Sequence, residues 1–199
     1  MGLADYGRAG TYLPRQIDRW TRQYRAAATE PIDAMERLIE WLPANIPHGD
    51  ETTVVHGDYR IDNIIFHPTE PRILAVLDWE LSTLGHPLAD FAYHVMTWRV
   101  TADEFRGIKG ADLAQLGIPD EAAYVEAYCR RTGRISIEDW DYYLAFNMFR
   151  MAAILQGILA RAIQGNATSS EAIATGQRAR PMAAAGWSQV EAMPAKQTS

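Results

Sequence analysis

The feature that most constrains the fold is a change of periodicity partway along the chain. Three short runs rich in β-branched residues, 53–55, 63–66 and 73–77, are enclosed by sequence whose apolar residues recur at helical spacing. The stretch His-Pro-Thr-Glu-Pro-Arg at 67–72 favours a turn, so the second and third runs are predicted to form a hairpin. The pattern predicts no other strands. We therefore expect an α+β protein that is mostly helical and carries a small β-hairpin insert.

Helices are predicted on both sides of this insert, and the whole chain, 1–199, is expected to form one domain. The predicted helices begin after Pro14, near Thr29, after Pro87, at Pro119, at Ser136 and at Thr168, and Pro43 and Gly133 are expected to end the second and fourth. Along the chain this gives leading helices (1–52), loops on short strands (53–80), a helical body (81–192) and a frayed tail (193–199).

Composition excludes several classes of protein. The net charge of -6 argues against a nucleic-acid surface and against a polybasic attraction to lipid. The single cysteine, Cys129, permits no intramolecular disulfide and fits a reducing compartment. The N-terminal residues contain no apolar run of the kind found in signal peptides, so none is expected, and no stretch approaches the roughly 20 apolar residues that span a bilayer. We expect a cytoplasmic protein with neither nucleic-acid nor membrane partners.

The chemistry is concentrated where the regular pattern breaks. His-Gly-Asp-Tyr-Arg-Ile-Asp-Asn (56–63) follows the first predicted strand, and Asp78 ends the third. The loop therefore presents Asp58 and Asn63 near a second carboxylate. Carboxylate and amide oxygens are hard ligands that suit Mg²⁺, and a remaining carboxylate can orient or deprotonate a hydroxyl. These groups are the ones that phosphoryl transfer requires.

At these residues a resemblance becomes specific. HGDYRIDN followed by LDWE resembles the catalytic and metal-binding loops of the aminoglycoside phosphotransferase family, distant cousins of protein kinases, and Gly-His-Pro-Leu-Ala-Asp-Phe (85–91) resembles that family's next characteristic stretch. The resemblance covers roughly residues 1–185. The opening DYGRAGTYLPRQIDRW looks most like the branch associated with acyl-CoA dehydrogenases. The implied fold is a kinase-like C-terminal lobe.

The resemblance implies an ATP-dependent phosphotransferase that acts on a hydroxyl of a small molecule, with Mg²⁺ and ATP as cofactors. Asp58 would be the catalytic base or the carboxylate that orients the hydroxyl. Asn63 and Asp78 would hold Mg²⁺ and, through it, the nucleotide. Arg60 either lies near the transferred phosphate as a catalytic cation or is a solvated surface residue. The sequence does not identify the acceptor, nor whether GTP replaces ATP.

Two further residues are implied to support the loop, and two features depart from the family. His56 would brace the loop and Asp90 would anchor its backbone from a helix. The family often has Gly-Asp-Pro where this chain has Gly-His-Pro, which leaves the role of His86 open. The only lysines, Lys109 and Lys196, follow the metal motif, whereas the nucleotide-binding lysine of a kinase precedes it.

The N-terminal nucleotide lobe is therefore expected to be missing, and the chain alone is expected to have little activity. Two alternatives remain. The chain is an inactive remnant or binding module that self-associates through the face left open by that lobe, or it is a Mg²⁺-dependent phosphohydrolase. A zinc or hydrolase site built on His67, His86 and His94 is disfavoured, because their spacing matches no ligand pattern.

Overall fold

The structure is a computed structural model that describes residue 6 and residues 10–49, 51–165 and 171–193. Its longer helices and its strands are α1 (Tyr12–Ala27), α2 (Asp33–Ala44), β1 (Thr53–Val55), β2 (Ile64–Phe66), β3 (Ile73–Val76), β4 (Thr83–Gly85), α3 (Pro87–Val95), α4 (Ala102–Phe105), α5 (Glu121–Thr132), α6 (Trp140–Ile163), α7 (Ala172–Gln177) and α8 (Ala179–Ala192). Short 3₁₀ turns cover Ile61–Asn63, Trp79–Leu81 and Met96–Trp98.

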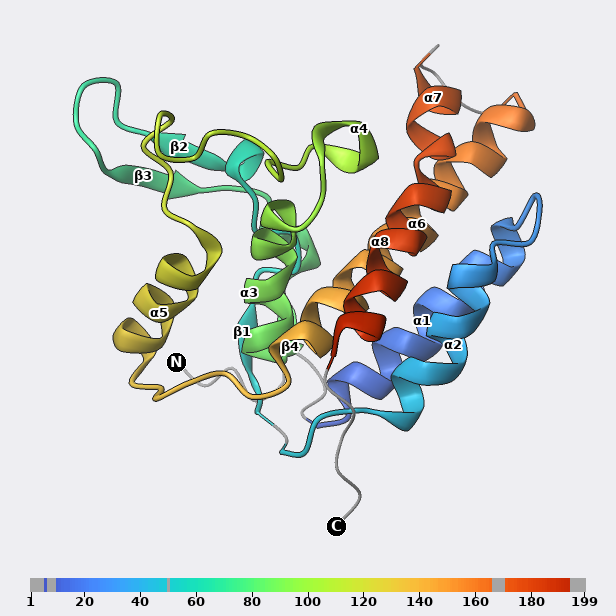
Figure 1. Cartoon of the computed structure of the whole chain (residues 1–199), viewed down its shortest axis with the longest axis horizontal. Helices are drawn as coiled ribbons and strands as arrows, with labels where there is room; N and C mark the ends of the chain where they lie inside the picture. The colour runs from blue at the N-terminus through green and yellow to red at the C-terminus, as the bar shows by residue number, and fades with distance from the viewer. Residues whose placement is uncertain (1–5, 7–9, 50, 166–170, 194–199) are drawn as a thin grey trace.

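A helical bundle forms one half of the molecule. The long helix α6 packs against α1, α3, α7 and α8, and α2 packs against α8 (Figure 1). The strands, α3 and α5 lie on the other side of α6, so the predicted β insert stands beside the bundle rather than inside it. The mostly helical α+β architecture agrees with the sequence expectation.

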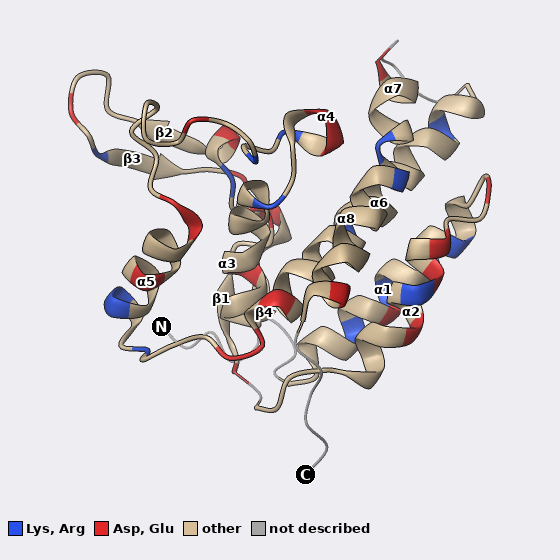
Figure 2. Cartoon of the chain, viewed as in Figure 1, with Lys and Arg blue, Asp and Glu red and all other residues tan. Residues whose placement is uncertain are grey.

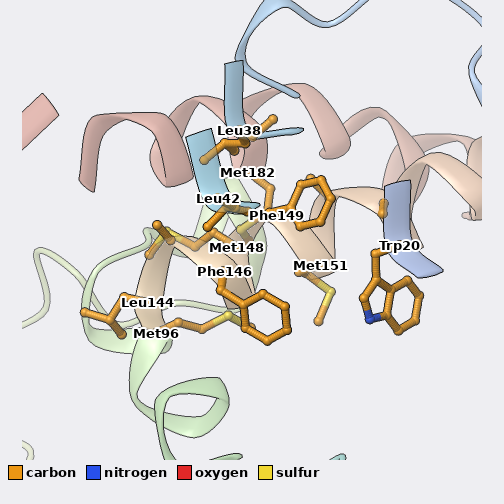
Figure 3. Close-up of a cluster of buried hydrophobic side chains, with 14 of the residues drawn as sticks. Trp20, Leu38, Leu42, Met96, Leu144, Phe146, Met148, Phe149, Met151 and Met182 are labelled. Atoms are coloured by element: carbon orange, nitrogen blue, oxygen red, sulfur yellow. The ribbon is translucent and has the colours of Figure 1, made fainter. Parts of the chain in front are cut away.

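The hydrophobic core is centred on α6. Met148 and Phe149 of α6 meet Leu38 and Leu42 of α2 and Met182 of α8, and all five side chains are almost completely buried (Figure 3). By length and composition α6 is apolar enough to cross a membrane, which the sequence analysis did not anticipate. However, 78% of its most apolar window is buried inside the protein, as expected of a core helix.

The strands form two small antiparallel sheets. In the predicted hairpin, Ile64 of β2 lies opposite Val76 of β3, with an irregularity in register near Phe66. In the second sheet, β1 pairs with β4, placing Val55 opposite Thr83. The sequence analysis missed β4. Its three residues have no periodicity of their own, and their pairing with a strand about thirty positions earlier defines them as a strand.

Three predicted helix starts were wrong, and one cannot be compared. The first helix begins at Tyr12, before Pro14, and the second continues one residue past Pro43, to Ala44. The second helix begins at Asp33 and not near Thr29, so Pro31 lies before it. The longest helix begins at Trp140, with Asp139 preceding it, so Ser136 is not its cap. Thr168 and the tail beyond Met193 lie outside the described residues. The helix of 119–131 is observed as α5, and Gly133 ends it in a left-handed conformation, as predicted.

Candidate active site

The loop between β1 and β2 begins with a backbone conformation that glycine alone adopts without strain. Gly57 has φ of +84° and is buried. A Cβ atom there would lie 2.6 Å from the backbone oxygen of Leu81, in the turn that follows Asp78. The loop can therefore lie directly against the segment that carries the second predicted metal ligand.

Asp90 joins this loop to helix α3. The backbone N–H of His56 donates to its Oδ2 at 2.8 Å, and the N–H of Gly57 donates to its Oδ1 at 2.9 Å. From the opposite side, Nη2 of Arg150 on α6 donates to the Gly57 carbonyl at 2.6 Å. Two helices therefore fix the peptide groups that immediately precede Asp58.

The carboxylate of Asp58 is held by three side chains. The hydroxyl of Tyr93 donates to Oδ1 at 2.7 Å, and Nδ2 of Asn63 donates to Oδ2 at 3.1 Å. Arg60 forms an ion pair with the same Oδ2, with Nε at 3.5 Å. Burial, and then the neighbouring Asp58 carboxylate, raise the pKa of Tyr93, so its hydroxyl remains protonated and donates. The orientation of Asp58 is thus set before any ligand binds.

Asn63 lies in the interior of the loop with one of its polar atoms free. Its Nδ2 also donates to the Asp58 carbonyl at 2.9 Å, and the side chain is only 6% exposed. Its Oδ1 accepts no hydrogen bond from any residue that the structure describes. The amide nitrogen therefore closes the loop, while the oxygen remains available to a ligand.

Asp78 is placed next to Asn63 through the backbone of Leu77. The Leu77 N–H donates to the Asn63 carbonyl at 2.8 Å, and the Leu77 carbonyl lies 2.7 Å from Nε2 of His56. Because Nδ1 of His56 accepts from the Asp58 N–H at 3.2 Å, Nε2 is the protonated nitrogen and donates to Leu77. Asp78 itself has a left-handed backbone, and its exposed side chain forms no ion pair or hydrogen bond with the described residues.

Arg60 lies at the surface of the loop between two carboxylates. Besides its contact with Asp58, its Nη1 lies 3.4 Å from Oδ2 of Asp62, and Arg106 reaches the same Asp62 oxygen at 3.2 Å. Asp62 therefore neutralises two arginines, and among the described residues its side chain forms no ion pair or hydrogen bond with Asn63 or Asp78. These ion pairs indicate that Asp62 is a loop residue rather than a metal ligand.

Sequence reasoning missed Tyr93 and Arg150. The guanidinium of Arg150 lies 4.8 Å from the centre of the Tyr93 ring and 5.5 Å from that of Trp20, and only 8% of the residue is exposed. One signal was available, since a lone arginine interrupts an otherwise apolar stretch of the longest helix. Tyr93 gave no such signal, because a tyrosine in a helix stripe is ordinarily a core residue.

The histidines do not form a metal site. Among the described residues, no three His, Cys, Asp or Glu side chains are grouped to bind a metal ion. His67 accepts N–H groups in the hairpin turn, His86 stacks on Tyr143 with ring centres 5.1 Å apart, and His94 lies among aromatic rings. The zinc alternative therefore has no support within this part of the chain.

Comparisons with known proteins agree with this arrangement. Residues 1–146 match the family described as "Phosphotransferase enzyme family" (APH). The chain is 48% identical over 187 residues to mouse acyl-CoA dehydrogenase family member 10, covering 93% of this chain and 18% of that protein. It is 42% identical over 188 residues to human acyl-CoA dehydrogenase family member 11, covering 92% of this chain and 24% of that protein.

A solved structure is also similar. A crystal structure from Ralstonia eutropha, assigned provisionally to the aminoglycoside phosphotransferases, superposes with a TM-score of 0.91 at 58% identity. The match covers 96% of this chain and 58% of that one, so the chain spans little more than half of the solved relative and at most a quarter of the curated ones reported above. With a kinase-like fold over this shared part and a family match across most of its length, the chain belongs to the APH family of phosphotransferase enzymes, and its relatives include the APH-like domains of acyl-CoA dehydrogenase family members 10 and 11.

Proposed function

We propose that this chain is the catalytic C-terminal lobe of an ATP-dependent phosphotransferase that acts on a hydroxyl group of a small molecule. The observation that carries the proposal is the linkage of two loops, one with Asp58 and Asn63 and the other with Asp78. Asn63 bonds to Asp58 directly, and the backbone of Leu77 brings Asp78 to the same place. Three oxygen-bearing side chains from two strand ends are thereby available on one rigid base.

Asp58 is the group we assign to the acceptor. Its carboxylate would orient the acceptor hydroxyl and take its proton as the new O–P bond forms and the bond between the terminal phosphoryl group and ADP breaks. Each Asp58 oxygen already accepts one hydrogen bond, from Tyr93 or Asn63, and each retains a lone pair for the substrate. These contacts lower the entropic cost of positioning the carboxylate.

Asn63 and Asp78 are the residues we assign to Mg²⁺. The free Oδ1 of Asn63 and the unpaired carboxylate of Asp78 are hard oxygen donors, and a set of two protein ligands suits an ion that retains water and shares its shell with phosphate. When bound, Mg²⁺ would neutralise charge on the phosphates. Arg60 lies beside Asp58 and could add a positive charge near the transferred group.

Nucleotide binding would require further protein contacts in addition to those from these loops. The only lysines of the chain, Lys109 and Lys196, follow the metal loop in sequence, while the solved relative continues well beyond the part shared with this chain. We propose that a further lobe supplies the phosphate-binding lysine and the glycine-rich cover. On this proposal the chain alone turns over ATP slowly or not at all.

Metal binding tests the proposal on the chain itself. Mn²⁺ replaces Mg²⁺ as an electron-paramagnetic-resonance probe, titrated with ATP present. We expect Asn63→Ala and Asp78→Ala each to weaken Mn²⁺ binding at least tenfold, whereas the matched control Asp62→Ala leaves it within about twofold. Equal binding by wild type and the Asp78→Ala variant would exclude the assignment.

A non-catalytic binding role is the second candidate, and one observation favours it. Both strands of the β2–β3 hairpin expose large apolar side chains, including Phe66 at 50% and Leu74 at 49%. A surface of this kind is normally covered by another element or another chain.

Phosphatase activity that requires Mg²⁺ but no nucleotide would instead support the phosphohydrolase alternative.

A further inference from the structure

A pocket of about 370 Å³ lies between β1, α3 and α5. Its walls include Val54 and Val55 of β1, Phe91 of α3, and Tyr124 and Tyr128 of α5. Tyr59, the residue that follows Asp58, also lines it. The volume falls within the range of pockets that bind small molecules.

The aromatic walls of this pocket are held in place by one another. Phe91 stacks on Tyr128 with ring centres 3.8 Å apart and an angle of 9° between the planes, and Tyr124 stacks on Trp98 at 4.9 Å. Tyr59 meets the His94 ring edge-on at 5.7 Å. These contacts between α3, α5 and the loop fix the rings before a ligand arrives, which lowers the entropic cost of binding.

The lining of the pocket includes no basic side chain. Its one charged lining residue is Asp90, whose two carboxylate oxygens each accept one hydrogen bond, from the N–H groups of His56 and Gly57. Behind the wall, burial lowers the pKa of His94 and favours its neutral form, and burial raises the pKa of Tyr124. An anionic ligand group would lose its hydration here without gaining an opposite charge.

Two hydroxyl groups in the pocket are free. The hydroxyls of Tyr59 and Tyr124 form no hydrogen bond with any other residue that the structure describes. They come from two different elements, the loop and α5. They can therefore donate to, or accept from, one polar group of a bound molecule, while the rings contact its apolar part.

We propose that this pocket is a binding site for an uncharged small molecule with a flat aromatic or apolar body and one hydroxyl or carbonyl group. The site is separate from the Asp58 carboxylate. The Asp58 carboxylate accepts a hydrogen bond from Tyr93 of α3, whereas the Tyr59 ring contacts His94, the next residue of α3. Consecutive residues of an α-helix point about 100° apart, so Asp58 and Tyr59 contact different sides of α3. The proposal goes beyond phosphotransfer and holds whether or not the chain is an active kinase.

The first test is binding of defined probes to the chain. We expect 2-naphthol, observed by ligand-detected NMR and titrated by calorimetry, to bind saturably. We expect that kanamycin, a polycation, does not compete with 2-naphthol for the pocket. No saturable binding of 2-naphthol, or its displacement by kanamycin, would overturn the proposal.

Variants then locate the probe. Tyr124→Phe removes one hydroxyl while keeping the ring, and we expect roughly fivefold weaker binding of 2-naphthol. Tyr124→Ala removes the ring as well, and a loss of at least tenfold is expected, with folding checked by circular dichroism. Leu116→Ala is the control, since Leu116 is 60% exposed and does not line the pocket. Full-strength binding by a folded Tyr124→Ala variant would also overturn the proposal.

Discussion

Replacing Asp90 by alanine tests the physical basis of the site. The substitution leaves the N–H groups of His56 and Gly57 without their shared acceptor. Both residues are buried, so water cannot easily replace the carboxylate. A hydrogen bond to a charged group contributes about 1.5–3 kcal/mol, so losing two of them should lower the free energy of unfolding by about 3–6 kcal/mol. Asp90→Asn retains one acceptor oxygen and should cost roughly half as much.

Urea denaturation followed by circular dichroism measures this change. Asp18→Ala is the matched control, because Asp18 is exposed on α1 and forms only a surface ion pair with Arg22, so its loss should change stability by less than about 0.5 kcal/mol. If Asp90→Ala also stayed within about 0.5 kcal/mol of wild type, the claim that Asp90 anchors the loop would be wrong.

Three further predictions concern the loop, the aromatic cluster and the hairpin. Gly57→Ala forces a Cβ onto the Leu81 carbonyl in a left-handed backbone and should cost at least about 2 kcal/mol in the same denaturation assay; a neutral result would refute the close approach. Burial lowers the pKa of His94, so below a pH of about 6.5 the unfolded state binds a proton that the folded state does not. The free energy of unfolding should therefore fall as the pH is lowered through this window, and it should fall less steeply in the His94→Phe variant. An equal slope in both proteins would contradict this. The β2–β3 hairpin, free of charge along its strands (Figure 2), should drive self-association in multi-angle light scattering, and Phe66→Glu with Leu74→Lys should abolish it; a monomeric wild type at high concentration would refute the idea.

The sequence predicted those parts of the fold that depend on local pattern. The hairpin and helix α5 were predicted because turn residues, β-branched runs and a terminal glycine act within a few positions. Strand β4 was missed because its partner, β1, is distant in sequence. The predicted start of α6 was wrong because it assumed that the side chain of Ser136 caps the helix. The helix is instead preceded by Asp139, which has a left-handed backbone and forms no side-chain cap.

The sequence singled out the polar residues of the candidate site and two of its supports, His56 and Asp90, but not Tyr93 or Arg150. Asp58, Asn63 and Asp78 stand out in the sequence because polar residues interrupt two strand ends. Tyr93 and Arg150 act on the same loop from helices, and only the packing of α3 against α6 brings them together. The aromatic pocket likewise needs three elements at once, so single residues such as Tyr59 and Tyr124 gave no signal of it.

Asp58 is the residue proposed to serve phosphoryl transfer. The direct measurement is ADP release, in a coupled assay with Mg²⁺ and a panel of small hydroxyl compounds, by the product of the complete reading frame that contains this chain. We expect Asp58→Asn to lower the rate by several orders of magnitude while Mn²⁺ binding persists, because Asn63 and Asp78, the proposed metal ligands, remain. An Asp58→Asn variant that released ADP as fast as wild type would contradict the account.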